Sequence, residues 1–189
     1  TRIGKLTKEL KDKNIWVVPT QALAKRWMSP IDPSVFGNAP EMKYMAANTR
    51  SQWMNSKSTI LNNPKYNADE VNRFIQLRRK LIFECNKSGV GLLLGSDAPQ
   101  VFNVPGFSTH QELKYMVDAG LTPYEALRTG TANVGRFFNI DVGIIKTGAI
   151  ADLVRLNGNP LQDINQTNHI EGVMLTGRWL SKEWIEKTL

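Results

Sequence analysis

The feature that most constrains the fold is a short apolar run at residues 90–94 that ends at Gly95-Ser96-Asp97. A run of this length, bounded by Gly89 and Pro99, is typical of a strand buried on both faces, as in a parallel sheet. In parallel α/β folds the chemistry lies at the carboxyl ends of strands, because the loops there converge on one face. Asp97 is therefore well placed to bind a metal or to accept a proton. The alternative is a turn residue, since an Asp side chain can bond its own backbone two residues on.

Composition indicates an ordinary globular chain. Its 189 residues are 41% apolar and 22% charged, which is enough for one sizeable domain with a core of its own. No apolar run approaches membrane-spanning length, and no signal-peptide pattern opens the chain. Because the first residue is Thr1 rather than Met, we expect an N-terminal piece to be missing. The compartment, cytoplasmic or periplasmic, is left open.

Few residues of this chain could bind a metal through nitrogen or sulfur. The single cysteine, Cys85, excludes an internal disulfide and a cysteine-based zinc site, and we expect it to be a small buried hydrophobe. The two histidines, His110 and His169, are fewer than a self-sufficient zinc enzyme usually needs. The net charge of +7 permits a basic nucleic-acid-binding module, an alternative that nothing else favours because the basic residues are scattered along helix faces. We expect neither nucleic acid nor membrane as a partner.

Helix and strand patterns alternate over the first 100 residues. The spacing of Ile3, Leu6 and Leu10 predicts a helix over residues 3–13, and residues 15–18 read as a buried strand that ends at Pro19-Thr20. A capping box at residues 67–70 predicts a second helix, which should end near Ser88-Gly89, ahead of the strand that carries Asp97. This alternation favours an α/β fold.

Residues 21–66 separate the two predicted strands and read as a long, irregular excursion with several prolines. A helix is predicted around Glu41 to Met54. Long excursions after a strand are usually lids or binding loops. The aromatic residues and methionines here therefore either line a pocket or form the small core of the insert.

Residues beyond Asp97 divide into a helical part and a strand-like part. Capping boxes at residues 109–112 and 122–125 each predict a helix start, and a further helix is predicted over about 132–138. From Asn139 on, the chain is punctuated by glycine, with strand patterns at 149–156, 173–175 and 179–180 and a turn at Thr176-Gly177. We therefore place a boundary near residue 140.

Several motifs, taken in chain order, carry a family resemblance. They are Gly-Ser-Asp-Ala-Pro at 95–99, Ala-Gly-Leu-Thr-Pro at 119–123, Glu-Ala-Leu at 125–127, Thr-Ala-Asn at 131–133, and the glycine-rich stretch 143–153. Together they resemble the C-terminal part of the metal-dependent amidohydrolase superfamily, in its imidazolonepropionase-like and Xaa-Pro dipeptidase-like branch. Ala149 and Asn159 depart from the family pattern where Lys and Asp are usual.

This resemblance implies an α/β fold, the C-terminal portion of a (β/α)8 TIM-like barrel followed by strands of a small β-sandwich. Residues 1–139 would be the last strands and helices of the barrel, with an inserted long loop at about 21–66. Residues 140–189 would be the C-terminal part of the sandwich. A whole barrel needs about 250 residues, so we expect only its last two strands here.

The resemblance also implies a function. Members hydrolyse amide, peptide or cyclic-amide C–N bonds with one or two Zn²⁺ ions, which are bound by several histidines, a Lys or Glu, and one Asp. Only that Asp has a counterpart, Asp97, implied to be a metal ligand and the proton acceptor in the intact enzyme. The other ligands would lie upstream of Thr1. The alternative is that the chain as given is a catalytically inactive fragment that holds no metal.

The resemblance further implies a small-molecule or dipeptide-like substrate and a pocket at the strand ends. Its walls would come from Thr20, Gln21, Ser96, Ala98, Phe102 and His110. Two interpretations of His110 are open: it lies near the metal at the start of a helix, or it is a surface residue. A truncated barrel exposes sheet edges and an apolar interior, so we predict a homo-oligomer.

Overall fold

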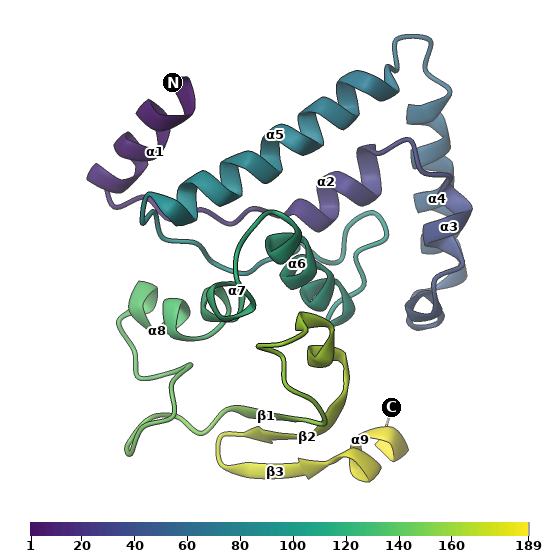
Figure 1. Ribbon diagram of the computed structural model, residues 1–189. Helices are drawn as coiled ribbons and strands as arrows, with labels where there is room; N and C mark the ends of the chain where they lie inside the picture. Colours follow the sequence, from purple (N-terminus) through teal and green to yellow (C-terminus); the bar gives the residue numbers. More distant parts are fainter. Residues whose placement is uncertain (189) are drawn as a thin grey trace.

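The computed structural model describes residues 1–188 as a mainly helical chain with one small antiparallel sheet (Figure 1). The α-helices are α1 (Arg2–Asp12), α2 (Gln21–Met28), α3 (Pro33–Gly37), α4 (Ala47–Leu61), α5 (Ala68–Lys87), α6 (Phe107–Asp118), α7 (Pro123–Thr129), α8 (Ala132–Phe138) and α9 (Lys182–Thr188). The 3-10 helices are η1 (Pro40–Tyr44) and η2 (Ile164–Asn168). The strands are β1 (Leu153–Leu156), β2 (Ile170–Leu175) and β3 (Arg178–Ser181).

The two segments predicted as buried strands run parallel but form only one bridge. The Val17 amide donates to the Gly91 carbonyl at 2.9 Å, and the Leu93 amide donates to the Val17 carbonyl at 3.0 Å. Neither segment is a regular strand among the described residues. The expectation that residues 15–18 are buried was wrong, because Ile15 and Val18 are 43% and 46% exposed. Val17, Val90 and Leu92 pack into the main core, whereas Trp16, which is half-buried, contacts Phe137 of α8.

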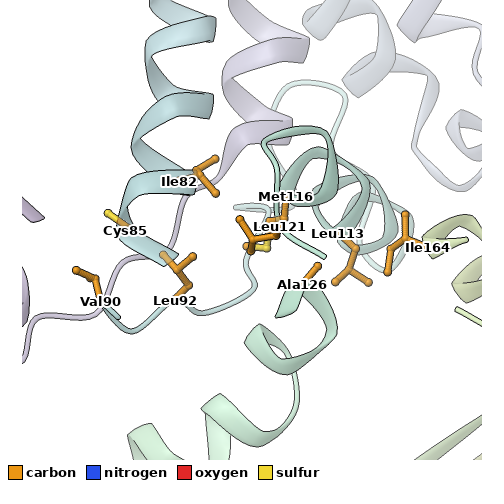
Figure 2. Packing of buried hydrophobic residues seen from close by; sticks show 9 residues of the cluster. All are labelled: Ile82, Cys85, Val90, Leu92, Leu113, Met116, Leu121, Ala126 and Ile164. Atoms are coloured by element: carbon orange, nitrogen blue, oxygen red, sulfur yellow. The ribbon is translucent and has the colours of Figure 1, made fainter. Parts of the chain in front are cut away.

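The main core lies where α5, α6 and α7 meet the 90–94 segment (Figure 2). Its buried members are Ile82, Cys85, Val90, Leu92, Leu113, Met116, Leu121, Ala126 and Ile164. Full burial of a large aliphatic side chain contributes about 1.5–3 kcal/mol, so this cluster is the main source of stability. Cys85 is 4% exposed, as expected for a small buried hydrophobe, and burial raises the pKa of its thiol.

The excursion at 21–66 is helical rather than a long irregular loop, since it contains α2, α3, η1 and α4. Part of its aromatic residues and methionines, including Trp53 and Met54, form a second core with the loop that follows Asp97. The buried members of that core are Phe36, Met42, Phe102 and Val104. The Phe102 ring lies 5.6 Å from Phe36 and 6.0 Å from Trp53, centroid to centroid. The second core therefore holds the insert against the loop after Asp97.

A buried lysine joins α4 to the end of α2. The ammonium of Lys57 donates to the carbonyl oxygens of Arg26 at 2.8 Å and Ser29 at 2.7 Å, and lies 3.2 Å from that of Trp27. These are carbonyls at a helix C-terminus, where a positive charge is favourable. Burial lowers the pKa of Lys57 to about 8.

The helix starts test the capping predictions. At α5 the Asn67 side chain accepts from the amides of Asp69 and Glu70, and at α7 Thr122 and Glu125 form the full capping box. The third prediction, a cap at residues 109–112, was wrong. Helix α6 begins at Phe107 after Gly106, whose φ of 81° suits glycine, so residues 109–112 lie inside the helix.

The C-terminal unit is the antiparallel sheet β1–β2–β3 with η2 and α9 (Figure 1). The turn between β2 and β3 is Thr176-Gly177, as predicted, with φ of 47° and 82°. The strand expected over 149–156 is shorter and begins at Leu153, and α9 was not predicted. Figure 1 shows α6 and α7 between α5 and this sheet. Within residues 1–188, no helix is both long and apolar enough to cross a membrane.

Candidate active-site edge

The two parallel segments end at the same edge of the molecule. Thr20 ends the first one in a left-handed conformation with φ of 48° and leads directly into α2. Asp97 ends the second one, also left-handed, with φ of 59°. Its carboxylate is exposed and makes no hydrogen bond or ion pair with any other part of residues 1–188. The Asp97 side chain makes no hydrogen bond with its own backbone. It therefore does not stabilise a turn, which was the alternative predicted from the sequence.

The backbone just before Asp97 is held by a buried polar cluster. The Ser96 carbonyl accepts from the Asn103 side-chain amide at 2.6 Å, and the hydroxyls of Ser96 and Ser108 lie 2.7 Å apart. Ser96 is 7% exposed, and Asn103 and Ser108 are fully buried. Hydrogen bonds in such surroundings hold a strand end in one geometry, so the position of Asp97 is set by the residues around it.

A second carboxylate, Glu112, fixes the other strand end. It is fully buried, and its two oxygens accept from the backbone amides of Gln21 at 2.9 Å and Ala22 at 2.6 Å. Burial raises the pKa of Glu112, while these two amides and the nearby Arg78 oppose that shift. Through Ser108 and Glu112, α6 thus contacts both strand ends.

Sequence reasoning missed this role of Glu112 by assigning it to a helix cap. The sequence did hold a signal for this role. Glu112 lies four residues before the buried Met116, a spacing that puts both side chains on the same, buried face of α6. Such a carboxylate requires strong partners, and here the first amides of α2 supply them.

The structure brings only some of the predicted pocket residues to this edge. Thr20 and Gln21 lie where the first segment meets α2, and Ser96 and the half-buried Ala98 flank Asp97 in the chain. The Gln21 side chain is 1% exposed; its amide donates to the Ile75 carbonyl at 3.3 Å, and its oxygen accepts from Arg78 at 3.0 Å. It therefore shapes the edge but has little free surface.

Phe102 and His110 are placed elsewhere. Phe102 has no exposed surface and lies in the second core, where its carbonyl accepts from Arg26 at 2.5 Å. His110 contacts the C-terminal unit through Nδ1, which lies 3.0 Å from the Thr167 hydroxyl. That hydroxyl donates to the Ile164 carbonyl at 2.9 Å, so His110 is the donor. Burial lowers the pKa of His110.

The donor set for a metal is incomplete in the part of the chain that the structure describes. Residues 1–188 contain no group of three His, Cys, Asp or Glu side chains placed to hold a metal ion. Asp97 is one carboxylate donor, which by itself does not fit the zinc centre that the sequence resemblance implies.

Comparison with known proteins places this geometry in a family. An ochratoxinase of Aspergillus niger is 37% identical over 82 residues, which are 41% of this chain and 16% of that protein. The structure of a bottromycin amidohydrolase matches 91% of this chain and 38% of its own, with 22% identity and a TM-score of 0.67. A Xaa-Pro dipeptidase structure matches 94% and 37%, with 18% identity and a TM-score of 0.61.

This chain thus spans less than two fifths of the length of those relatives. The amidohydrolase family model matches residues 72–180, which include the extended segment before Asp97, the helix α6 and nearly all of the sheet. The resemblance found in the sequence motifs is confirmed, and the chain belongs to the amidohydrolase family.

Proposed function

We propose that this chain forms the last two strands of a (β/α)8 TIM-like barrel and part of a small β-sandwich in a metal-dependent hydrolase. The parallel bridge between Val17 and Leu92 supports the barrel assignment, because parallel neighbours are the rule in that fold. The antiparallel sheet β1–β2–β3 supports the assignment of residues 140–189. The enzyme would hydrolyse amide, peptide or cyclic-amide C–N bonds in small-molecule or dipeptide-like substrates.

The observation that carries this proposal is the exposed, unpartnered carboxylate of Asp97 at the carboxyl end of a parallel segment. A carboxylate with no partner inside the chain is free to contact a substrate or a metal. Family membership gives the reaction class, and the relatives are named for ochratoxin, Xaa-Pro dipeptides and bottromycin.

In this proposal Asp97 is both a metal ligand and the proton acceptor. Its carboxylate would take a proton from the attacking water and deliver it to the leaving nitrogen, the usual task of a general base that then acts as an acid. One or two Zn²⁺ ions would need further ligands from outside residues 1–188, because the described residues supply no complete donor set. The chain by itself would then be catalytically inactive.

Thr20, Ser96 and Ala98 would form the pocket wall nearest Asp97. The contacts of Ser108 and Glu112 would keep the two strand ends at a constant separation. Because catalysis loses much of its rate when a reacting group moves by about 1 Å, this support would matter for rate as well as for folding.

The test is hydrolysis of dipeptides and N-acyl amino acids by the full protein that contains this sequence, with Asp97→Asn beside Asp152→Asn. Loss of a general acid–base group lowers the rate by about 10²–10⁴-fold, so the first variant should lose at least about 100-fold in kcat. Asp152 accepts from the Thr176 amide in the sheet, and its variant should keep its rate. Equal activity of the two variants would overturn the role of Asp97.

A further inference from the structure

A separate cleft lies on the outer side of α2, between that helix, α5 and α6. Its volume is about 200 Å³, and the residues used below are Lys25, Ser29, Ile31, Ile75, Arg79 and Tyr115. One water occupies about 30 Å³ of the liquid, so the cleft has room for a small organic molecule. It is smaller than the roughly 300–1,000 Å³ of pockets for drug-sized ligands.

Two cations line this cleft without a carboxylate partner. The Lys25 ammonium lies 4.9 Å from the centroid of the Tyr115 ring, and nothing else in residues 1–188 accepts a hydrogen bond from it. The Arg79 guanidinium donates to the Asp118 carbonyl and lies 3.4 Å from the side-chain oxygen of Gln76. The one carboxylate at the rim, that of Asp118, is held by Lys114 at 2.8 and 3.0 Å. The cleft therefore has an excess of positive charge.

A buried hydroxyl in the cleft wall also lacks a partner. Ser29 is 3% exposed, and its Oγ makes no hydrogen bond within the described chain. Buried polar groups are nearly always hydrogen-bonded, so an unpaired one in a cleft wall needs an explanation. The Oγ atom itself has almost no exposed surface, so Ser29 belongs to the wall of the cleft, and the inference rests on the two cations and the apolar side chains.

We propose that this cleft binds a small organic carboxylate with an apolar body. Arginine is suited to a carboxylate because its planar fork can donate two parallel hydrogen bonds, and Lys25 adds a second positive charge. Ile31, Ile75 and the Tyr115 ring offer apolar surface for the rest of the molecule. The groups that carry this inference lie outside the Asp97 loop, so it stands apart from the proposed hydrolysis.

Benzoate is a suitable probe, added to the ¹⁵N-labelled chain and followed by NMR. We expect saturable shifts confined to the amides of residues 25–31, 72–79 and 115–118. Lys25→Gln and Arg79→Gln should each weaken binding about tenfold or more, because each removes a charge-assisted contact. Lys25→Arg should keep binding, because it keeps the charge.

The matched control is Lys80→Gln, because Lys80 follows Arg79 on α5, is exposed and does not line the cleft. Its affinity for benzoate should equal that of the unchanged chain. Equal loss in Lys80→Gln and Lys25→Gln would mean diffuse attraction to a basic surface and would overturn the site.

Two further probes decide the chemistry of the ligand. Benzamide has the same shape without the charge, and inorganic phosphate has charge without an apolar body. If benzamide binds as tightly as benzoate, the role of the two cations is overturned. If phosphate binds as tightly as benzoate, the role of the apolar wall is overturned. Absence of saturable shifts with millimolar benzoate overturns the proposal as a whole. The same spectra report whether each variant is folded. If Arg79→Gln does not fold, the comparison of Lys25→Gln with Lys25→Arg still tests the role of the positive charge.

Discussion

The two sides of the parallel segments at 15–18 and 90–95 differ sharply. On one side, Val17, Val90, Leu92 and Leu94 pack into the main core with α5, α6 and α7. On the other side, Val18 is 46% exposed, and Trp16 is half-buried against Phe137 and Arg136 of α8. The same few residues thus provide one well-packed face and one largely bare face.

The glycines of the second segment belong to the bare side. A Cβ at Gly91 would lie 2.2 Å from the Trp16 ring, and one at Gly95 would lie 2.6 Å from Val18. Their absence of side chains lets Trp16 and Val18 lie across the neighbouring segment. The comparison teaches that the helix-facing side is packed within residues 1–188, whereas the other side leaves apolar surface such as that of Val18 exposed.

The largest expected effect separates two neighbouring leucines on opposite sides. Leu92→Ala should lower the free energy of unfolding by about 2–5 kcal/mol, because it leaves a cavity in the main core. Leu92 is 2% exposed, while Leu93 is only half-buried, so Leu93→Ala should cost clearly less. Urea denaturation of both variants measures the difference. Equal losses would show that the two sides are packed alike.

The two carboxylates at the strand ends should differ in the same way. Glu112→Ala leaves the amides of Gln21 and Ala22 without their acceptor and should destabilise the chain by about 1–3 kcal/mol. Asp97→Asn should change stability by less than about 0.5 kcal/mol, because the side chain is exposed and unpaired and Asn tolerates the left-handed backbone at this position. Thermal unfolding checks both. A large loss in the Asp97 variant would mean that this residue has a structural role.

The bare side should also drive self-association. We predict that the chain forms dimers or larger species at high concentration, and that Val18→Lys raises the dissociation constant by about tenfold, because it puts a charge on the apolar surface. Val35→Lys is the matched control, since Val35 is 60% exposed and lies on α3, outside the two parallel segments. Light scattering distinguishes them. A stable monomer at every concentration would remove the bare side as a contact surface.

The smallest effect concerns pH and the contact between α6 and the C-terminal unit. Burial holds the pKa of His110 below 6.5, so the unfolded chain binds more protons there than the folded one. The free energy of unfolding should therefore rise as the pH is raised toward 6.5, and it should be lower at more acidic pH. His110→Gln should flatten this dependence in denaturation measured at several pH values. An unchanged profile would place the cause elsewhere.

Local signals predicted the local parts of the fold well. Helices α1, α5, α7 and α8 and the Thr176-Gly177 turn follow from apolar spacing, caps and turn residues, all of which act within a few residues. Helices α2 and α4 lack a side-chain cap, and α2 is completed by Glu112 and Lys57 from distant parts of the chain. Contacts of that kind leave no mark at the helix itself, so α2 was not predicted, whereas the helix expected around Glu41 to Met54 overlaps η1 and α4.

The candidate site was predictable to a similar extent. The position of Asp97 at the end of a parallel segment followed from the apolar run before it, and the family followed from motifs spread over residues 95–153. The extended segments were expected to be regular strands but form one bridge, and a pair of strands without a further neighbour is only marginally stable. The roles of Phe102 and His110 depended on the packing of the insert and of η2, which no local pattern reveals.

The central claim is the proposal that Asp97, at the carboxyl end of the 90–95 segment, is a metal ligand. The zinc content of the protein tests it most directly. Elemental analysis of the full protein that contains this sequence should give near-stoichiometric zinc for the unchanged protein and for Asp152→Asn, and clearly less for Asp97→Asn. Full zinc occupancy in the Asp97→Asn variant would contradict the account, because Asp97 would then not be needed to hold the metal.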